Sequence, residues 1–181
     1  GLQAVGPGEA SKRIDTAALA IAQRMPLGEI ALADFCYAPP YSGAMDNLVH
    51  LATTLENKVT GLAVGRSPLA IRRMIDEGED FVLLDVRTPA EHMAERIADP
   101  RHRFIPLEEL RERAGELPKD KEVVAYCKTA LRGYEAMRIL KGAGFGKASF
   151  LDGGIVTWPF ALEKGWRPID AGRPPSGGQR G

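Results

Sequence analysis

One short stretch of the chain combines a potential nucleophile with two cationic side chains. It contains Cys127, followed directly by Lys128 and then, after three more residues, by Arg132. The apolar run at 122–126 is typical of a buried strand, and a helical pattern begins near Gly133. A thiol in a strand-to-helix loop faces backbone N–H groups and the positive end of the helix dipole, which favour the thiolate. The sequence therefore predicts that Cys127 is a nucleophilic cysteine.

Short strands that alternate with helices are expected to position this loop. Such alternation favours an α/β fold with a mainly parallel sheet and helices on both faces. In sheets of this kind, functional sites lie at the carboxyl ends of the strands, which is the predicted place of Cys127. The expected strands span 81–86, 104–105, 122–126 and 148–151, and the expected helices span 67–75, 89–95, 107–114, 133–141 and 154–162.

The first third of the chain has a different character. Apolar spacing predicts helices at 14–22 and 45–57, with an extended, proline-stiffened segment at 35–42 between them. Two helices and a loop bury little surface alone, so this part needs a partner. Glycine and proline near both ends predict disordered segments at 1–10 and 169–181.

Composition excludes several classes of function. The chain of 181 residues has 24 Lys and Arg and 24 Asp and Glu, which argues against binding to nucleic acid or a membrane surface through bulk charge. No apolar run is long enough to span a bilayer. Two cysteines are too few for a disulfide framework and indicate a reducing compartment, the cytoplasm. We expect Cys36 to be a small, buried structural residue.

The sequence between about 61 and 168 resembles a rhodanese domain. The resemblance rests on three motifs, which are Asp85-Val86-Arg87-Thr88-Pro89-Ala90-Glu91, the loop Cys127-Lys128-Thr129-Ala130-Leu131-Arg132, and Leu151-Asp152-Gly153-Gly154 before Trp158. It implies a sulfurtransferase in which Cys127 accepts sulfur from a small sulfane-sulfur donor, carries it as a persulfide, and passes it to a thiol or to cyanide. It implies no metal.

The resemblance also implies roles for the neighbouring residues. Arg132 would hold the loop, with Glu91 or Asp85 as its acidic partner. Arg87 would either face the pocket or brace the end of the strand. The loop residues from 128 to 132 would bind the substrate, and for Lys128 a donor contact and a solvated side chain are both open.

Two features keep alternatives open. Many rhodanese loops carry glycine where Ala130 stands, and a positive φ there would cost alanine about 1 kcal/mol. The alternative function is therefore a catalytically weak docking or regulatory module. Tyrosine phosphatases also use a cysteine and an arginine around an anion, but with five intervening residues, whereas four lie between Cys127 and Arg132. Phosphatase activity is disfavoured.

Residues 12–16 and 35–46 resemble the end of the dimerisation domain of flavin-dependent pyridine-nucleotide disulfide reductases. The nearest subgroup is the CoA-disulfide and CoA-persulfide reductases, some of which carry a C-terminal rhodanese domain. This resemblance implies reductase domains as partners, allows a homodimer, and makes Tyr37 and Tyr41 candidates for reaching a partner protomer's active site. Ordinary interface packing is the other interpretation of both tyrosines.

The chain contains no Gly-x-Gly-x-x-Gly motif after a strand. We therefore expect no cofactor in this chain, and FAD, NAD(P)H and CoA only in a longer parent protein. The chain is either the C-terminal piece of such a flavoprotein or a diverged protein that kept this tail. The predicted organisation is a disordered segment at 1–10, a partial dimerisation segment at 11–60, a rhodanese-like domain at 61–168, and a disordered tail at 169–181.

Overall fold

A computed structural model describes residues 1–6, 10–40 and 42–165, so Tyr41 and the predicted tail at 169–181 lie outside the described residues. The chain divides into two units, Gly1–Val64 and Gly65–Gly181. The division falls a few residues after the predicted boundary at 60 and 61. No helix among the described residues is long and apolar enough to cross a membrane.

The first unit contains three helices, α1 (Ser11–Ala22), α2 (Leu27–Ala31) and α3 (Asn47–Val59). The short helix α2 was not predicted, because five residues are too few to show a helical period. Asp46 caps α3 by accepting a hydrogen bond from the Leu48 N–H at 2.8 Å. The expectation that Cys36 is buried is wrong, since this residue is exposed in the extended segment between α2 and α3.

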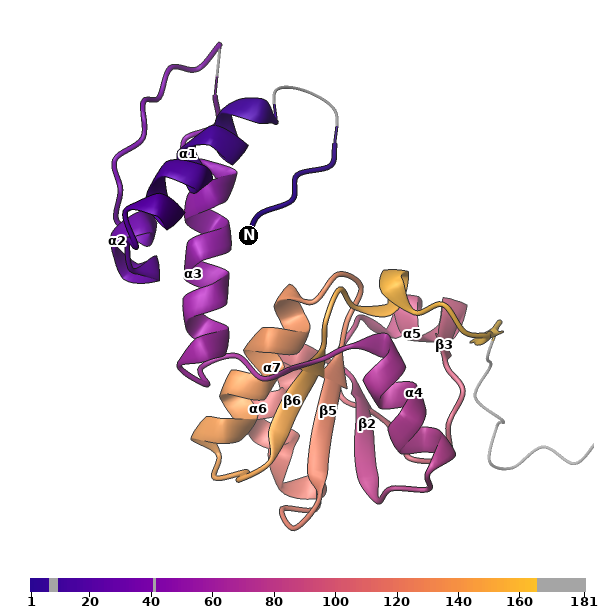
Figure 1. Cartoon of the computed structure of the whole chain (residues 1–181). Coiled ribbons are helices and arrows are strands. Elements are labelled where there is room, and N and C mark those ends of the chain that lie inside the picture. The colour runs from indigo at the N-terminus through magenta and orange to yellow at the C-terminus, as the bar shows by residue number, and fades with distance from the viewer. Residues whose placement is uncertain (7–9, 41, 166–181) are drawn as a thin grey trace, which may run out of the picture. The chain divides into compact units, whose positions relative to one another are not determined.

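The second unit is built on a five-stranded sheet in the order β1-β6-β5-β2-β4, in which all paired strands are parallel (Figure 1). The α/β fold with a mainly parallel sheet is thereby confirmed. Strand β1, at the edge of the sheet, is too short to be recognised in the sequence. The strands are β1 (Gly65–Arg66), β2 (Phe81–Asp85), β4 (His102–Phe104), β5 (Glu122–Tyr126) and β6 (Ala148–Leu151).

Helices cover both faces of this sheet. Helices α4 and α5 lie on one face, and α6 and α7 lie on the other (Figure 1). Ser67 caps α4, and Thr88 with Glu91 forms a capping box at the start of α5. The bounds are α4 (Pro68–Asp76), α5 (Pro89–Ala94), α6 (Leu110–Arg113), α7 (Leu131–Gly142), and the 3₁₀ turns η1 (Leu107–Glu109), η2 (Ala114–Glu116) and η3 (Ile155–Thr157).

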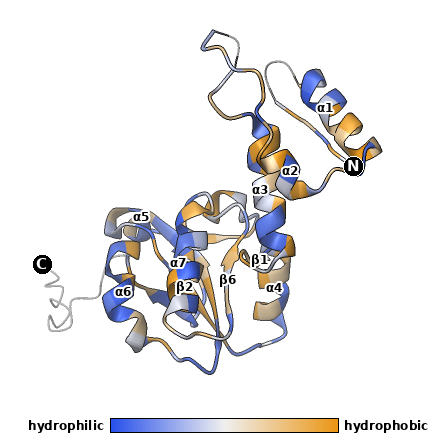
Figure 2. Cartoon of the chain, turned by 90° about the vertical axis from the view of Figure 1, so that its left-hand side faces the viewer, coloured by the Kyte–Doolittle hydropathy of each residue, from blue (hydrophilic) through white to orange (hydrophobic). Residues whose placement is uncertain are grey.

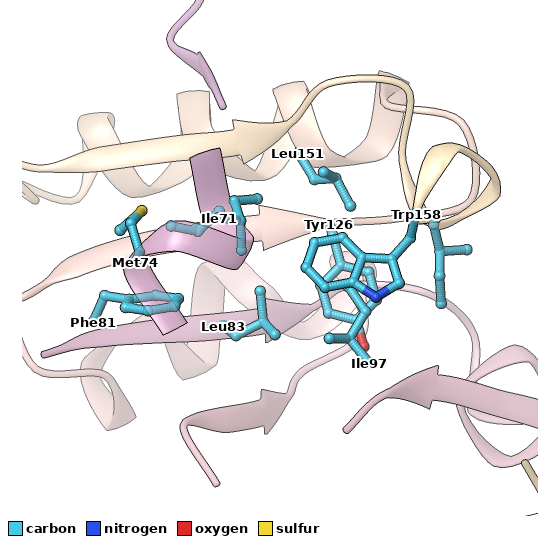
Figure 3. Packing of buried hydrophobic residues seen from close by; sticks show 10 residues of the cluster. Ile71, Met74, Phe81, Leu83, Ile97, Tyr126, Leu151 and Trp158 are labelled. Carbon is cyan, nitrogen blue, oxygen red and sulfur yellow. The ribbon is translucent and has the colours of Figure 1, made fainter. Parts of the chain in front are cut away.

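One buried hydrophobic cluster of the core lies between the sheet and α4. Ile71 and Met74 of α4 pack over Leu83 of β2, and the cluster continues to Tyr126 and Trp158 (Figure 3). In Figure 2 the central strands are coloured hydrophobic, whereas the surrounding helices carry hydrophilic residues on much of their surface. This pattern explains why the strands are almost continuously apolar in sequence, since both of their faces are covered.

The prediction of a helix at 154–162 is wrong. Only the turn η3 forms there, and the strand β7 (Leu162–Lys164) follows and pairs antiparallel with β3 (Glu95–Ile97). Pro159 gives the physical reason, because proline disfavours helical backbone at the preceding residue. Trp158 accordingly has an extended conformation, with φ −76° and ψ 108°.

Candidate active site

Cys127 lies at the carboxyl end of β5, directly before the loop that leads into α7. Its Sγ accepts a hydrogen bond from the Ala130 N–H at 3.2 Å, and the residue is only 1% exposed. Within the described part of the chain, the N–H groups of Lys128, Thr129 and Leu131 donate no hydrogen bond. The sulfur therefore lies in a loop, called the cradle below (residues 127–132), that supplies one backbone donor to it and leads into the N-terminus of a twelve-residue helix, a natural site for an anion.

The segment after β6 fixes the orientation of this cradle. The carbonyl oxygen of Cys127 accepts from the Ile155 N–H at 2.8 Å, and that of Lys128 accepts from the Val156 N–H at 3.2 Å. Both carbonyls are thereby engaged outside the cradle. Gly154 makes this close approach possible, because a Cβ at this residue would overlap the backbone of Lys128.

Arg132, at the far end of the cradle, pairs with Glu91 of α5. Two hydrogen bonds of 2.8 Å join the guanidinium to the two carboxylate oxygens. The hydrogen bond from Arg132 lowers the pKa of Glu91 to about 2, with further help from Thr88. Of the two acidic partners that the sequence left open, Glu91 is the one that contacts Arg132.

Asp85 pairs instead with Arg87, and both are buried. The Arg87 Nε lies 2.9 Å from Oδ1 and its Nη2 lies 2.8 Å from Oδ2. Burial alone would raise the pKa of Asp85, but the nearby His102 and the hydrogen bonds and charge of Arg87 hold it well below its usual range. Because Arg87 also donates to the Glu95 carbonyl at 2.6 Å, it braces the end of the strand, one of the two roles considered for it.

Other site residues predicted from the sequence lie on the protein surface. The side chains of Lys128, Thr129 and Leu131 are exposed beside the buried sulfur. Tyr37 is 54% exposed in the first unit. The structure thus brings Cys127, the loop, Arg132 and Glu91 together, and it gives Asp85 and Arg87 a separate buried pairing.

Three residues that sequence reasoning missed surround Asp85. His92 Nδ1 lies 3.1 Å from Asp85 Oδ2, and the Tyr126 hydroxyl donates to the same oxygen at 3.0 Å. Since Tyr126 has a single proton to give, His102 Nε2, at 3.1 Å from its oxygen, must be the donor in that contact. The carboxylate accepts only, so His92 carries its proton on Nδ1. Both histidines therefore act as donors in one network.

The types of these residues also fit a metal site, but their geometry does not. Asp85, His92 and His102 hold their ligand atoms within 4.8 Å of one another. The two imidazole rings, however, are stacked at 20° with centroids 5.1 Å apart, so their in-plane lone pairs run side by side instead of converging. Arg87 already neutralises the carboxylate through both oxygens. The cluster is better described as a hydrogen-bonded network.

His92 is expected to resist protonation in the folded protein. Burial lowers its pKa from the ordinary value of 6.5, against the opposing effect of Asp85. An NMR titration should show the His92 imidazole signal, identified by its loss in His92→Phe, changing with a midpoint below pH 6.5. Because the unfolded chain binds this proton more readily, this group should make the domain less stable as the pH falls from 6.5 through the folded-state pKa. A His92 midpoint above 6.5 would contradict this interpretation.

Ala130 has the positive φ that was considered from the sequence, because many rhodanese loops carry glycine at this position. Its φ is 106° and its ψ is −35°. Ala130→Gly should therefore stabilise the domain by about 1 kcal/mol in urea unfolding, because glycine adopts positive φ without strain. The matched control is Ala90→Gly on the exposed side of α5, which should destabilise by about 1 kcal/mol. Equal losses in both variants would show that Ala130 is not strained.

Comparison with known proteins identifies relatives of the second unit. The family described as "Rhodanese-like domain" matches residues 67–160. A sulfurtransferase of Allochromatium vinosum is 38% identical over 93 residues, which cover 49% of this chain and 81% of the relative.

Two solved structures extend the similarity to more of the chain. The NAD-dependent persulfide reductase from A. fulgidus is 43% identical with a TM-score of 0.65, and the match covers 84% of this chain and 26% of that one. Reduced CoADR-RHD of Bacillus anthracis is 34% identical with a TM-score of 0.70, covering 82% and 26%. This chain spans about a quarter of the length of both structures. The motifs, the parallel sheet, the cysteine cradle and these matches together establish that the chain belongs to the rhodanese-like domain family and is related to sulfurtransferases.

Proposed function

We propose that Cys127 accepts a sulfane sulfur as a persulfide and transfers it to a thiol or cyanide. The observation that carries this proposal is the contact between the Cys127 Sγ and the Ala130 N–H at the start of α7, within a loop whose other N–H groups at 128, 129 and 131 donate no hydrogen bond among the described residues. The donors without other partners would hold the anionic outer sulfur of the persulfide. Lys128 and Arg132 would attract an anionic donor to the site.

The reaction needs no external oxidant or reductant. The Cys127 thiolate attacks the sulfane sulfur of a donor such as thiosulfate, a bond forms between Sγ and that sulfur, and sulfite leaves with the electron pair of the broken S–S bond. An acceptor thiolate or cyanide then attacks the outer sulfur. The bond to Sγ breaks, and the Cys127 thiolate is regenerated.

We further propose that the chain is the C-terminal part of a larger FAD- and NAD(P)H-dependent CoA-disulfide or persulfide reductase in the cytoplasm. The similarity to the persulfide reductase and to CoADR-RHD supports this proposal. FAD, NAD(P)H and CoA would then be bound by the parent protein, and residues 11–60 would complete its dimerisation domain. Tyr37 and Tyr41 would lie at the partner protomer's site or in the interface.

The direct test is the formation of thiocyanate by the purified chain. Polysulfide or thiosulfate is supplied as donor with cyanide as acceptor, and initial rates are compared with the uncatalysed reaction. Saturable turnover is expected with at least one donor. A rate equal to the background with both donors would favour the docking or regulatory module instead.

A further inference from the structure

The network around Asp85 has members on β2 and the loop that follows it, on α5, on β4 and on β5. Asp85 ends β2, and Arg87 follows it in the next loop. His92 comes from α5, His102 from β4, and Tyr126 from the end of β5. A single oxygen of Asp85, Oδ2, lies 2.8 Å from Arg87 Nη2, 3.0 Å from the Tyr126 hydroxyl and 3.1 Å from His92 Nδ1. One carboxylate oxygen thus joins three different segments.

Two members of this network stand next to the two ends of the cradle in sequence. Tyr126 directly precedes Cys127, and its own carbonyl accepts from the Val86 N–H at 3.1 Å. His92 directly follows Glu91, which holds Arg132 through two hydrogen bonds of 2.8 Å. The position of Tyr126 therefore fixes the Cα of Cys127, and the position of α5 fixes the anchor of Arg132.

We infer that the hydrogen-bonded network of Asp85, Arg87, His92, His102 and Tyr126 is a positioning device that sets both ends of the sulfur-binding cradle. None of these side chains is assigned contact with the sulfur, so each acts through a neighbour. The inference rests on the proposed role of Cys127 as the sulfur carrier. It assigns a task to the buried His92 and the half-buried His102, which the proposed reaction does not use directly.

The side chains of the network are held in place by burial and by ring contacts, as a positioning role requires. His92 is 4% exposed and stacks on Phe104 with ring centroids 4.1 Å apart. The Arg87 guanidinium lies 5.4 Å from the centroid of the Tyr126 ring, so the ring is held on its face as well as at its hydroxyl. Each polar member has a partner inside the network, and buried networks of this kind specify one arrangement of the elements that they join.

The first test removes the Tyr126 hydroxyl and its two hydrogen bonds while keeping the ring. In a Cys36→Ser background, Tyr126→Phe deletes the hydroxyl shared by Asp85 and His102. The rate constant for persulfide formation on Cys127 with polysulfide should fall about tenfold. Alkylation of Cys127 by iodoacetamide, which needs no sulfur donor, should slow in parallel. Ile71→Val is the matched control, since it destabilises the core cluster that contains Tyr126 without removing a hydrogen bond of the network.

A second pair of variants separates positioning from general stability. His102→Gln keeps an N–H donor for the Tyr126 hydroxyl and should retain most of the rate, whereas His102→Leu should lose it. If Tyr126→Phe and His102→Leu slow both reactions no more than Ile71→Val does at equal loss of stability, the network does not position the cradle. If the unmodified protein forms no persulfide but Tyr126→Phe still slows alkylation, the sulfur-carrier role fails and the positioning role stands.

Discussion

Replacing Cys127 with serine is expected to reduce sulfur transfer to the uncatalysed rate, a loss of at least about 10³-fold. The serine hydroxyl stays protonated near neutral pH and cannot hold a sulfane sulfur in a persulfide bond. The size of the side chain and the hydrogen bond from the Ala130 N–H change little, so the domain should remain folded. Thiocyanate formation from polysulfide and cyanide measures the effect.

The second cysteine provides the matched control for this result. Cys36 is exposed in the first unit, and Cys36→Ser should keep the full rate. Measurable turnover by Cys127→Ser, or loss of turnover in Cys36→Ser alone, would remove Cys127 as the nucleophile.

Gly154→Ala is expected to disable the cradle from outside the catalytic loop. The added Cβ would overlap the Lys128 backbone, so either the cradle or the segment after β6 must move. That movement would break the hydrogen bonds that hold the Cys127 and Lys128 carbonyls away from the sulfur. A displacement of about 1 Å at a reacting group can reduce a rate by about 10²-fold, and we expect a loss of thiocyanate formation of that order.

Gly78→Ala separates this effect from ordinary backbone strain. Gly78 has φ +69°, close to the +66° of Gly154, but nothing lies within 4 Å of its Cβ position. Both variants place alanine at a positive φ and should be destabilised, Gly154→Ala the more because its ψ of −167° lies in a region essentially restricted to glycine, and only Gly154→Ala should also lose activity. Full activity in Gly154→Ala would show that the close approach of the two loops is not needed.

The buried strands and the catalytic loop could be predicted because their signals are local. The run from Phe81 to Asp85 is buried on both faces, so its sequence is apolar at every position before the carboxylate. Cys127 follows a second apolar run, at 122–126, and therefore lies at the carboxyl end of a parallel strand, where functional sites of such sheets are found. The pairing of Arg132 with Glu91 needed the fold, because the two residues lie 41 positions apart.

The network around Asp85 could not be read from the sequence for a related reason. Its histidines lie on α5 and β4, and no short motif joins them. The one available signal was that Asp85 and Tyr126 both lie at the carboxyl end of a predicted strand. The structure pairs these two residues directly between β2 and β5. The antiparallel pair β3 and β7 was also missed, because each strand has only three residues and neither shows a clear alternation.

The intact mass of the Cys36→Ser protein after exposure to polysulfide and removal of excess reagent tests the role of Cys127 most directly. A single adduct of about 32 Da is expected, located on Cys127 by peptide mapping and removed by cyanide. No adduct is expected when Cys127→Ser is added to the same background. An unmodified mass in the protein that retains Cys127, or an adduct that survives cyanide, would contradict the central claim that Cys127 carries sulfur for transfer.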